Sequence, residues 1–281
     1  MKIALIGVEN SHADAFWNLI YSNKEKYGDV SIEGVFSEED GATDRFNCFK
    51  AEKYDGFLGK VDAVMITARH GDNHYKYAMP YVKAGIPCFI DKPFCASLEK
   101  ARELIKIAQE NGVPLCGGSC VKFLDEIKPL NRLKKEIKVT GGTCICPISP
   151  EAKYGGFWFY SQHLVELMIA VFGKGVKSVT AYFPDENKKR LSCIFNYGAY
   201  DVLGLYNASQ MYYANVVGEE FKFFEARCDN VAYTFEHELD EFLQMAESGV
   251  MPQSYDDLIY PVKVLDAIER SYKTKKEAEV L

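Results

Sequence analysis

The sequence predicts two domains: an α/β domain with a parallel sheet covered by helices on both faces (residues 1–118), and an α+β domain with a mainly antiparallel, open sheet (residues 119–281). Three observations predict this organisation. Strand-like and helix-like segments alternate up to Gly118, later strand-like segments follow one another directly, and 281 residues are long for one core but comfortable for two.

In the first domain, short apolar runs of the kind buried on both faces of a sheet alternate with helical segments. Gly85 and Gly112 stand where glycine commonly ends a helix, and Ser97 caps the start of another. The expected elements are strands over Lys2–Gly7, Ser31–Phe36, Ala63–Thr67, Pro87–Ile90 and Pro114–Cys116, and helices over Ala13–Asn23, Tyr75–Ala84 and Leu98–Asn111.

The second domain contains strand-like segments rich in Tyr, Phe, Val and Cys, separated by Gly, Asn and Asp turns, which is typical of an antiparallel sheet. The C-terminal tail KTKKEAEV is expected to be solvated. The expected helices are Phe123–Ile137, Ser161–Phe172, Thr234–Ser248 and Ser254–Lys273, and the expected strands are Thr143–Cys146, Ser178–Phe183, Leu191–Tyr197, Asp201–Ala208, Met211–Val217 and Glu220–Ala226.

Composition narrows the classes of function. A net charge of −7 argues against a nucleic-acid partner or an anionic membrane surface. No apolar run approaches the ~20 residues needed to cross a bilayer, and no signal peptide opens the chain, so we expect a cytoplasmic protein. The nine cysteines are irregularly spaced and lack zinc-knuckle spacing, which favours reduced thiols and no metal site.

The turn after the first strand departs from the dinucleotide-binding pattern G-x-G-x-x-G, because its three glycine positions hold Gly7, Glu9 and His12. The next helix still offers free N–H groups and a partial positive charge to an anion. A carboxylate about 4 Å from the pyrophosphate would oppose binding by several kcal/mol at an effective dielectric of about 20. If a dinucleotide binds, Glu9 must turn outward or hydrogen-bond a ribose. We expect Gly7, Glu9, Asn10, Ser11 and His12 near the cofactor, with His12 either reaching a phosphate or only packing.

The end of the second expected strand favours NAD over NADP. Ser37 stands where an acid would hold the adenine ribose, and Glu38 and Glu39 follow directly. Either glutamate could bind the 2′- and 3′-hydroxyls and would repel a 2′-phosphate. The absence of an arginine at this strand end supports the same preference.

Four segments in order resemble the Gfo/Idh/MocA family of sugar and inositol dehydrogenases. Asp91-Lys92-Pro93 stands after a strand and before the Ser-capped helix, where the family carries Glu-Lys-Pro. The other segments are His74, Gly155 through Glu166, and Ser254 through Ser271. The resemblance implies a Rossmann-type first domain that binds a nicotinamide cofactor. We expect Thr67, His70, His74, Asp91 and Lys92 to lie near that cofactor.

Lys92 follows a parallel strand at the edge where ligands collect, so it can hydrogen-bond substrate and the nicotinamide ribose, or simply be neutralised by Asp91. Histidine has an unperturbed pKa of ~6.5, which makes His163 suitable as a general base, although a histidine at a helix start is also commonly structural. The resemblance makes Lys92 and His163 the catalytic pair. Tyr160 and Glu166 are expected to contact substrate, but Phe159 replaces the aspartate that the family carries four residues before this histidine.

His70 and His74 flank Gly71, which argues against one helical face and therefore against a shared metal ion. Helix capping by Asp72 or Asn73 and contacts near the nicotinamide are the preferred roles for this loop.

The leading interpretation is an NAD-dependent oxidoreductase that transfers hydride between nicotinamide and a sugar- or polyol-like small molecule. The competing interpretation is a relative that keeps the fold but acts as a ligand-binding or regulatory protein. A third is an enzyme that uses bound NAD for elimination or hydrolysis. The resemblance implies a homodimer or homotetramer formed through the aromatic-rich sheet, unless the chain's own segments cover that face.

Overall fold

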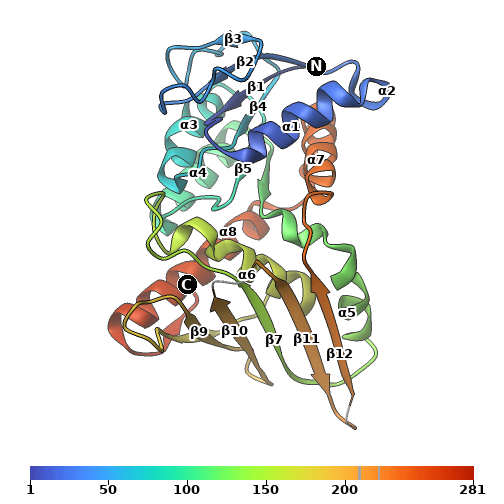
Figure 1. Ribbon diagram of the computed structural model, residues 1–281, viewed down its shortest axis with the longest axis vertical. Coiled ribbons are helices and arrows are strands. Elements are labelled where there is room, and N and C mark those ends of the chain that lie inside the picture. The colour runs from blue at the N-terminus through green and yellow to red at the C-terminus, as the bar shows by residue number, and fades with distance from the viewer. Residues whose placement is uncertain (208–209, 221) are drawn as a thin grey trace. The chain divides into compact units, whose positions relative to one another are not determined.

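The computed structural model describes residues 1–207, 210–220 and 222–281, and its chain contacts form two compact units (Figure 1). The first unit comprises residues 1–118 and 232–259, and the second comprises residues 119–231 and 260–281. By these contacts the chain leaves the first unit after Gly118 and returns to it at residues 232–259. The division into domains of residues 1–118 and 119–281 stays a prediction.

The first unit is built on a six-stranded parallel sheet with the order β3-β2-β1-β4-β5-β6, which confirms the predicted doubly wound fold. The strands form where the chain is apolar on both sides, and β4, β5 and β6 are buried along their whole length. Their bounds are β1 Lys2–Ile6, β2 Ser31–Phe36, β3 Phe49–Lys50, β4 Ala63–Ile66, β5 Cys88–Asp91 and β6 Leu115–Gly118.

Helices cover both faces of this sheet: α1 packs against α7, and α3 against α4 (Figure 1). The apolar side chains Leu239, Phe242 and Met245 of α7 belong to the same buried cluster as Phe16 of α1 and Phe89 of β5. This packing is the physical reason that residues 232–259 join the first unit. The helices are α1 Ser11–Ser22, α2 Lys24–Tyr27, α3 Gly71–Lys83, α4 Leu98–Asn111 and α7 Thr234–Ser248.

The second unit holds a seven-stranded sheet with the order β12-β11-β7-β10-β9-β8-β13. All neighbouring pairs are antiparallel except β7 and β10, so the sheet is mixed but mainly antiparallel, as predicted. The bounds are β7 Val139–Pro147, β8 Ser178–Tyr182, β9 Leu191–Asn196, β10 Asp201–Asn207, β11 Tyr212–Gly218, β12 Phe223–Cys228 and β13 Ala278–Glu279.

One face of this sheet packs against α6, Trp158–Phe172. Glycines permit the close approach, because a Cβ on Gly204 would meet Phe195 and Leu164, and one on Gly142 would meet Phe172. The opposite face carries Ile194, Leu203 and Leu205, which are 36–44% exposed. Alternation along β10 between buried and exposed residues produces these two faces.

Several elements differ from the prediction. The expected helix Phe123–Ile137 is instead two 3₁₀ turns, Cys120–Phe123 and Asp125–Ile127, followed by α5, Lys128–Leu133, because Pro129 lacks the N–H that a longer helix would need. Part of the tail expected to be solvated forms β13 on the edge of β8. The last helix, α8, spans Tyr255–Thr274. The predicted strand end at Ala208 lies outside the described residues.

All nine cysteines are free thiols, and all except Cys48 are buried. Burial raises the pKa of the Cys88, Cys95, Cys144 and Cys193 thiols well above the ordinary value. Such thiols are poor nucleophiles at neutral pH. Every helix in the described part of the chain is too short or too polar to span a bilayer.

Replacing Gly7 by Ala tests how tightly the first turn is packed. Gly7 has a φ of +84°, and a Cβ there would lie 2.5 Å from the backbone of Ala68. We expect Gly7→Ala to lower the free energy of unfolding by about 2–5 kcal/mol, because a positive φ costs about 1–2 kcal/mol and overpacking about 1–3 kcal/mol. Urea unfolding measures this loss.

Gly112→Ala is the matched control, since Gly112 also has a positive φ of +62° but a Cβ there would meet no atom within 4 Å. It should lose only the backbone contribution of about 1–2 kcal/mol. Equal losses in the two variants would contradict the packing explanation.

Candidate active site

The turn after β1 is anchored to both neighbouring strands. The backbone N–H groups of Gly7 and Val8 donate to the carbonyl of Phe36 at the end of β2, and Thr67 Oγ1 after β4 donates to the Gly7 carbonyl at 3.2 Å. Thr67 is fully buried. The structure thus places Gly7, Thr67 and the start of α1 together at the carboxyl edge of the sheet, where ligands of such folds bind.

Glu9 turns across the strand ends. Its carboxylate accepts hydrogen bonds from the Ser37 hydroxyl at 2.8 Å and from the Arg69 backbone N–H at 3.0 Å. Both partners lie just after strands of the sheet, and neither belongs to the first turn of α1. Whether Glu9 turns outward or hydrogen-bonds a ribose when a dinucleotide binds stays a prediction; here its carboxylate contacts Ser37 and Arg69.

Asn10 caps α1 and links it to β5. Its side-chain oxygen accepts from the backbone N–H of His12 at 3.3 Å, while its amide nitrogen donates to Asp91 Oδ2 at 3.3 Å. The neighbouring Ser11 hydroxyl contacts the same Asn10 oxygen at 3.5 Å, at an exposed position. An asparagine cap leaves the helix N-terminus ordered and still positive.

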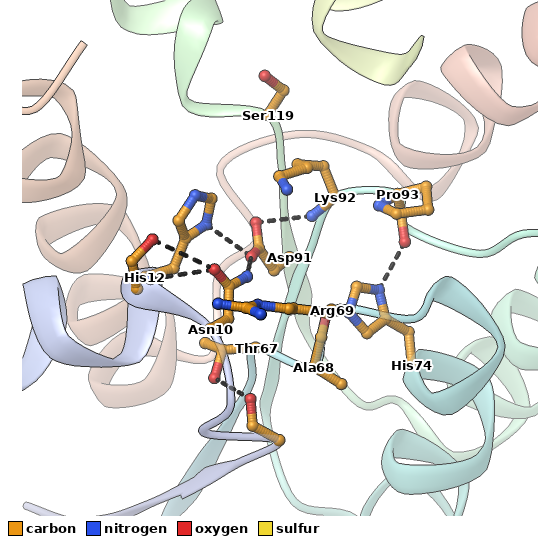
Figure 2. A network of polar contacts seen from close by, with 12 residues as sticks. Asn10, His12, Thr67, Ala68, Arg69, His74, Asp91, Lys92, Pro93 and Ser119 are labelled. Carbon is orange, nitrogen blue, oxygen red and sulfur yellow. Dashed lines mark hydrogen bonds and ion pairs between the residues drawn. The ribbon is translucent and has the colours of Figure 1, made fainter. Parts of the chain in front are cut away.

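Asp91 is the centre of a buried polar network (Figure 2). Its side chain is 1% exposed; Oδ1 accepts the backbone N–H of Lys92 at 2.7 Å, and Oδ2 lies 2.6 Å from His12 Nδ1. Figure 2 shows the Asn10 amide and the His12 ring both directed at this carboxylate. Burial alone would raise the pKa of Asp91, but the charge and hydrogen bond of His12, with Lys92 and His74, hold it below its ordinary value.

Lys92 is held at the end of β5 by this network and is itself only 3% exposed. A buried ammonium is retained only where polar groups compensate its desolvation, which concentrates such lysines at functional sites. The sequence predicted that Lys92 follows a strand at the ligand-binding edge. It did not predict that the Asn10 and His12 side chains both contact the neighbouring Asp91.

His74 is completely buried and fastens two loops. Its ring nitrogens lie 2.6 Å from the Pro93 carbonyl and 2.7 Å from the Ala68 carbonyl (Figure 2). Burial, the largest influence, lowers the pKa of His74, against the raising effects of Asp91 and the two carbonyls. This placement gives His74 a structural role beneath the site rather than direct access to a ligand.

His70 rather than Asp72 or Asn73 caps α3, because its Nδ1 accepts the Asp72 backbone N–H at 3.2 Å. The helix also begins earlier than predicted, at Gly71, where a Cβ would collide with Pro93. The glycine therefore permits close packing instead of interrupting the helix. Within the described residues, no group of three or more His, Cys, Asp or Glu side chains is placed to share a metal ion.

In the second unit, His163 lies on α6 and is 3% exposed. Its Nδ1 is 2.6 Å from Ser119 Oγ, and the Ser119 hydroxyl also accepts the Val121 N–H at 3.4 Å. Tyr160 and Tyr212 flank the ring with centroid distances of 5.5 and 5.7 Å. A serine hydroxyl can accept from or donate to an imidazole, so Ser119 orients His163 in either tautomer.

Glu166 is a buried carboxyl one turn beyond His163. It accepts hydrogen bonds from the Gln162 amide at 3.1 Å and weakly from the Ser119 backbone N–H at 3.5 Å. Burial raises the pKa of Glu166, and Lys122 and these hydrogen bonds only partly oppose that shift. Phe159 packs against Tyr154 and Tyr160, so the position that carries an acid in the resembled family is aromatic here.

Sequence reasoning missed three residues at these positions. Ser119 and Gln162 support His163 and Glu166, and Arg45 hydrogen-bonds the carbonyls of Val8 and Asn10 and the carboxylate of Asp14. Although no arginine stands at the end of β2, the Arg45 side chain therefore contacts the turn after β1. The signal for Ser119 was its place directly after Gly117-Gly118; Arg45 gave none, since its partners are distant in the sequence.

Comparisons with known proteins show what this chain is similar to. Residues 1–118 match the model of the Gfo/Idh/MocA family, described as an oxidoreductase family with an NAD-binding Rossmann fold. UDP-N-acetylglucosamine 3-dehydrogenase of Acidithiobacillus ferrooxidans is 32% identical over 123 residues, which are 42% of this chain and 36% of that relative. The chain thus matches about a third of that curated relative's length.

Solved structures resemble the whole chain. Myo-inositol 2-dehydrogenase from Lactobacillus plantarum has a TM-score of 0.85 at 13% identity, covering 100% of this chain and 99% of that one. Scyllo-inositol dehydrogenase from Lactobacillus casei, solved with NAD(H) and scyllo-inositol, has a TM-score of 0.82 at 14% identity with the same coverage. At such identities the likeness shows the fold. The family model thus matches residues 1–118, and the likeness to the solved inositol dehydrogenases extends the fold over the whole chain.

Proposed function

We propose that the protein is an NAD-dependent oxidoreductase that moves hydride between nicotinamide and a sugar- or polyol-like small molecule. The observation that carries the proposal is Lys92, buried at the carboxyl end of β5 inside the unit that matches an NAD-binding oxidoreductase family. The bound NAD(H) and scyllo-inositol of the Lactobacillus casei structure indicate the class of ligands to test.

The residues after β1 fit a dinucleotide. Gly7 makes the turn, Asn10 and Ser11 open α1, and the Glu9 carboxylate is drawn toward Ser37 and Arg69 rather than onto the helix N-terminus. That terminus can therefore receive a pyrophosphate. A bound NAD would supply the hydride acceptor. The chain contributes orientation of the cofactor and management of the substrate proton.

In this proposal the Lys92 ammonium donates to the substrate oxygen and stabilises it as its proton leaves, while His163 Nε2 accepts that proton. The Nδ1–H of His163 can stay hydrogen-bonded to Ser119 Oγ before and after the transfer. The buried Glu166 carboxyl forms a hydrogen bond with a substrate hydroxyl in this proposal, with Tyr160 as a further contact.

A second candidate function is ligand binding or regulation without redox turnover. Phe159 favours it, because an aromatic side chain packed between Tyr154 and Tyr160 replaces the acid of the resembled family. Turnover with a change in NADH separates the two functions.

We also propose that a second copy of the chain covers the open sheet face in a homodimer or homotetramer. The apolar side chains Ile194, Leu203 and Leu205 on that face support this arrangement, because exposed apolar clusters commonly mark interaction surfaces.

Cofactor binding is tested by thermal unfolding with NAD, NADH, NADP and NADPH. At 100 times the dissociation constant, a bound cofactor adds about 2.7 kcal/mol to the free energy of unfolding, so the melting temperature should rise with NAD or NADH. An unchanged melting temperature with all four compounds at millimolar concentration would rule out the proposed oxidoreductase.

Catalytic roles are tested with Lys92→Met and His163→Asn, assayed through NADH absorbance with inositols, hexoses and UDP-linked sugars. We expect kcat to fall about 10²–10⁴-fold in each variant, because each loses a proton-transfer group. Lys106→Met, at an exposed position on α4, is the control and should keep wild-type kcat. Full turnover in Lys92→Met would contradict its assigned role.

Glu166→Gln tests the buried carboxyl. A raised pKa means that the folded state holds the proton more tightly, so wild-type stability is lost as pH rises through the folded-state pKa. The amide avoids that cost, so Glu166→Gln should melt at a higher temperature than wild type in alkaline buffer, and the difference should shrink in acid.

The exposed Glu186→Gln is the control and should show no such dependence on pH. A difference that stays constant from acid to alkaline buffer would show that ionisation of Glu166 is not its cause.

A further inference from the structure

Glu9 stands at the second glycine position of the turn, yet its carboxylate lies over the strand ends. Its partner Ser37 follows β2, and its partner Arg69 follows β4. In the sheet these two strands lie on either side of β1. The carboxylate therefore spans the carboxyl end of β1, beside the position after β2 that holds a ribose-binding acid in dinucleotide-binding folds.

The Ser37 hydroxyl is oriented toward Glu9. Ser37 Oγ accepts the backbone N–H of Glu39 at 3.1 Å, so the hydroxyl proton is available for Glu9 Oε2 at 2.8 Å. This arrangement holds the Glu9 side chain in one place before any ligand arrives. Preorganised acceptors cost less to use in binding than mobile ones.

Glu38, the acid directly after Ser37, is engaged by a different partner. Glu38 is exposed and forms an ion pair with Lys76 of α3, and the hydrogen bond from Lys76 is the main reason that the pKa of Glu38 is lowered. Glu39 is exposed. Of the acids considered from the sequence, Glu9 is the one fixed on both sides of β1.

We propose that Glu9 is the residue that binds the adenine-ribose hydroxyls and selects NAD over NADP, an inference that rests on the proposed function. In this arrangement the acid comes from Glu9 in the turn after β1, and the position after β2 holds the small polar residue Ser37. A carboxylate offers about four acceptor sites. Ser37 and Arg69 use two of them, which leaves acceptors for the two vicinal hydroxyls of a ribose.

The same carboxylate disfavours NADP, because a 2′-phosphate would bring a further charge of about −1.5 to −2 next to it. Arg45 could in principle compensate that charge, but its guanidinium is hydrogen-bonded to the carbonyls of Val8 and Asn10 and paired with Asp14. The placement of Glu9 also leaves the start of α1 to the pyrophosphate, so the acid and the dinucleotide are compatible.

The test is fluorescence titration of NADH and NADPH into wild type, Glu9→Gln and Asp40→Asn, with the melting temperature of each free protein as the check on folding. Glu9→Gln keeps the side-chain shape and removes the charge, whereas Asp40→Asn removes an equal charge from an exposed position in the loop after β2.

Wild type should bind NADH more tightly than NADPH. Glu9→Gln should weaken NADH binding about tenfold or more, because hydrogen bonds to a charged acceptor are lost, without weakening NADPH binding. Asp40→Asn should keep the wild-type preference. Ser37→Ala, which releases one side of the carboxylate, should weaken NADH binding less than Glu9→Gln does.

Two results would overturn this assignment alone: NADH binding to Glu9→Gln that is unchanged or tighter than in wild type, or a loss of selectivity in Glu38→Gln instead. Failure of wild type to bind either nucleotide would overturn the proposed function, and the assignment with it.

Discussion

One buried carboxylate, that of Asp91, is the interaction on which the candidate site of the first unit depends. Burying a charge costs several kcal/mol unless hydrogen bonds and a partner compensate it. Here the Lys92 N–H, the Asn10 amide and the His12 ring provide that compensation. Because these groups come from the turn after β5 and from the start of α1, compensating one charge also joins the turn that carries Lys92 to the turn after β1. His74 adds a second link, because its ring nitrogens contact the Pro93 and Ala68 carbonyls.

The elements that were predicted correctly from the sequence depend on interactions between residues close together in the chain. Apolar runs identified β1, β4 and β5, and the helix ends at Ser97 and Gly112 were correctly placed, because strand burial and capping depend on neighbouring residues. Lys92 could be placed at the ligand edge since a parallel strand ends directly before it. The role of each residue in catalysis or cofactor binding remains a prediction, because the likeness to solved structures establishes the fold and the family model matches residues 1–118.

The contacts that could not be predicted from the sequence join residues that lie far apart in the chain. Nothing near Asp91 names His12 as its partner, and nothing near His163 names Ser119. The amphipathic pattern of α7 predicts a helix but not which core receives its apolar face. In the same way, Glu9 reads locally as an obstacle to a dinucleotide, and only its contacts with Ser37 and Arg69 show that its charge is drawn aside.

The packing of α7 in the first unit limits how residues 1–118 can be transferred between proteins by recombination. The family match ends at Gly118, but Leu239, Phe242 and Met245 complete the hydrophobic cluster that surrounds Phe16 and Phe89. A segment cut at Gly118 would expose that cluster to water. Residues 1–118 are therefore recognisable as a unit in sequence but do not bury their hydrophobic cluster by themselves. Recombination that moves them to another protein must also move α7 or supply another apolar helix face in its place.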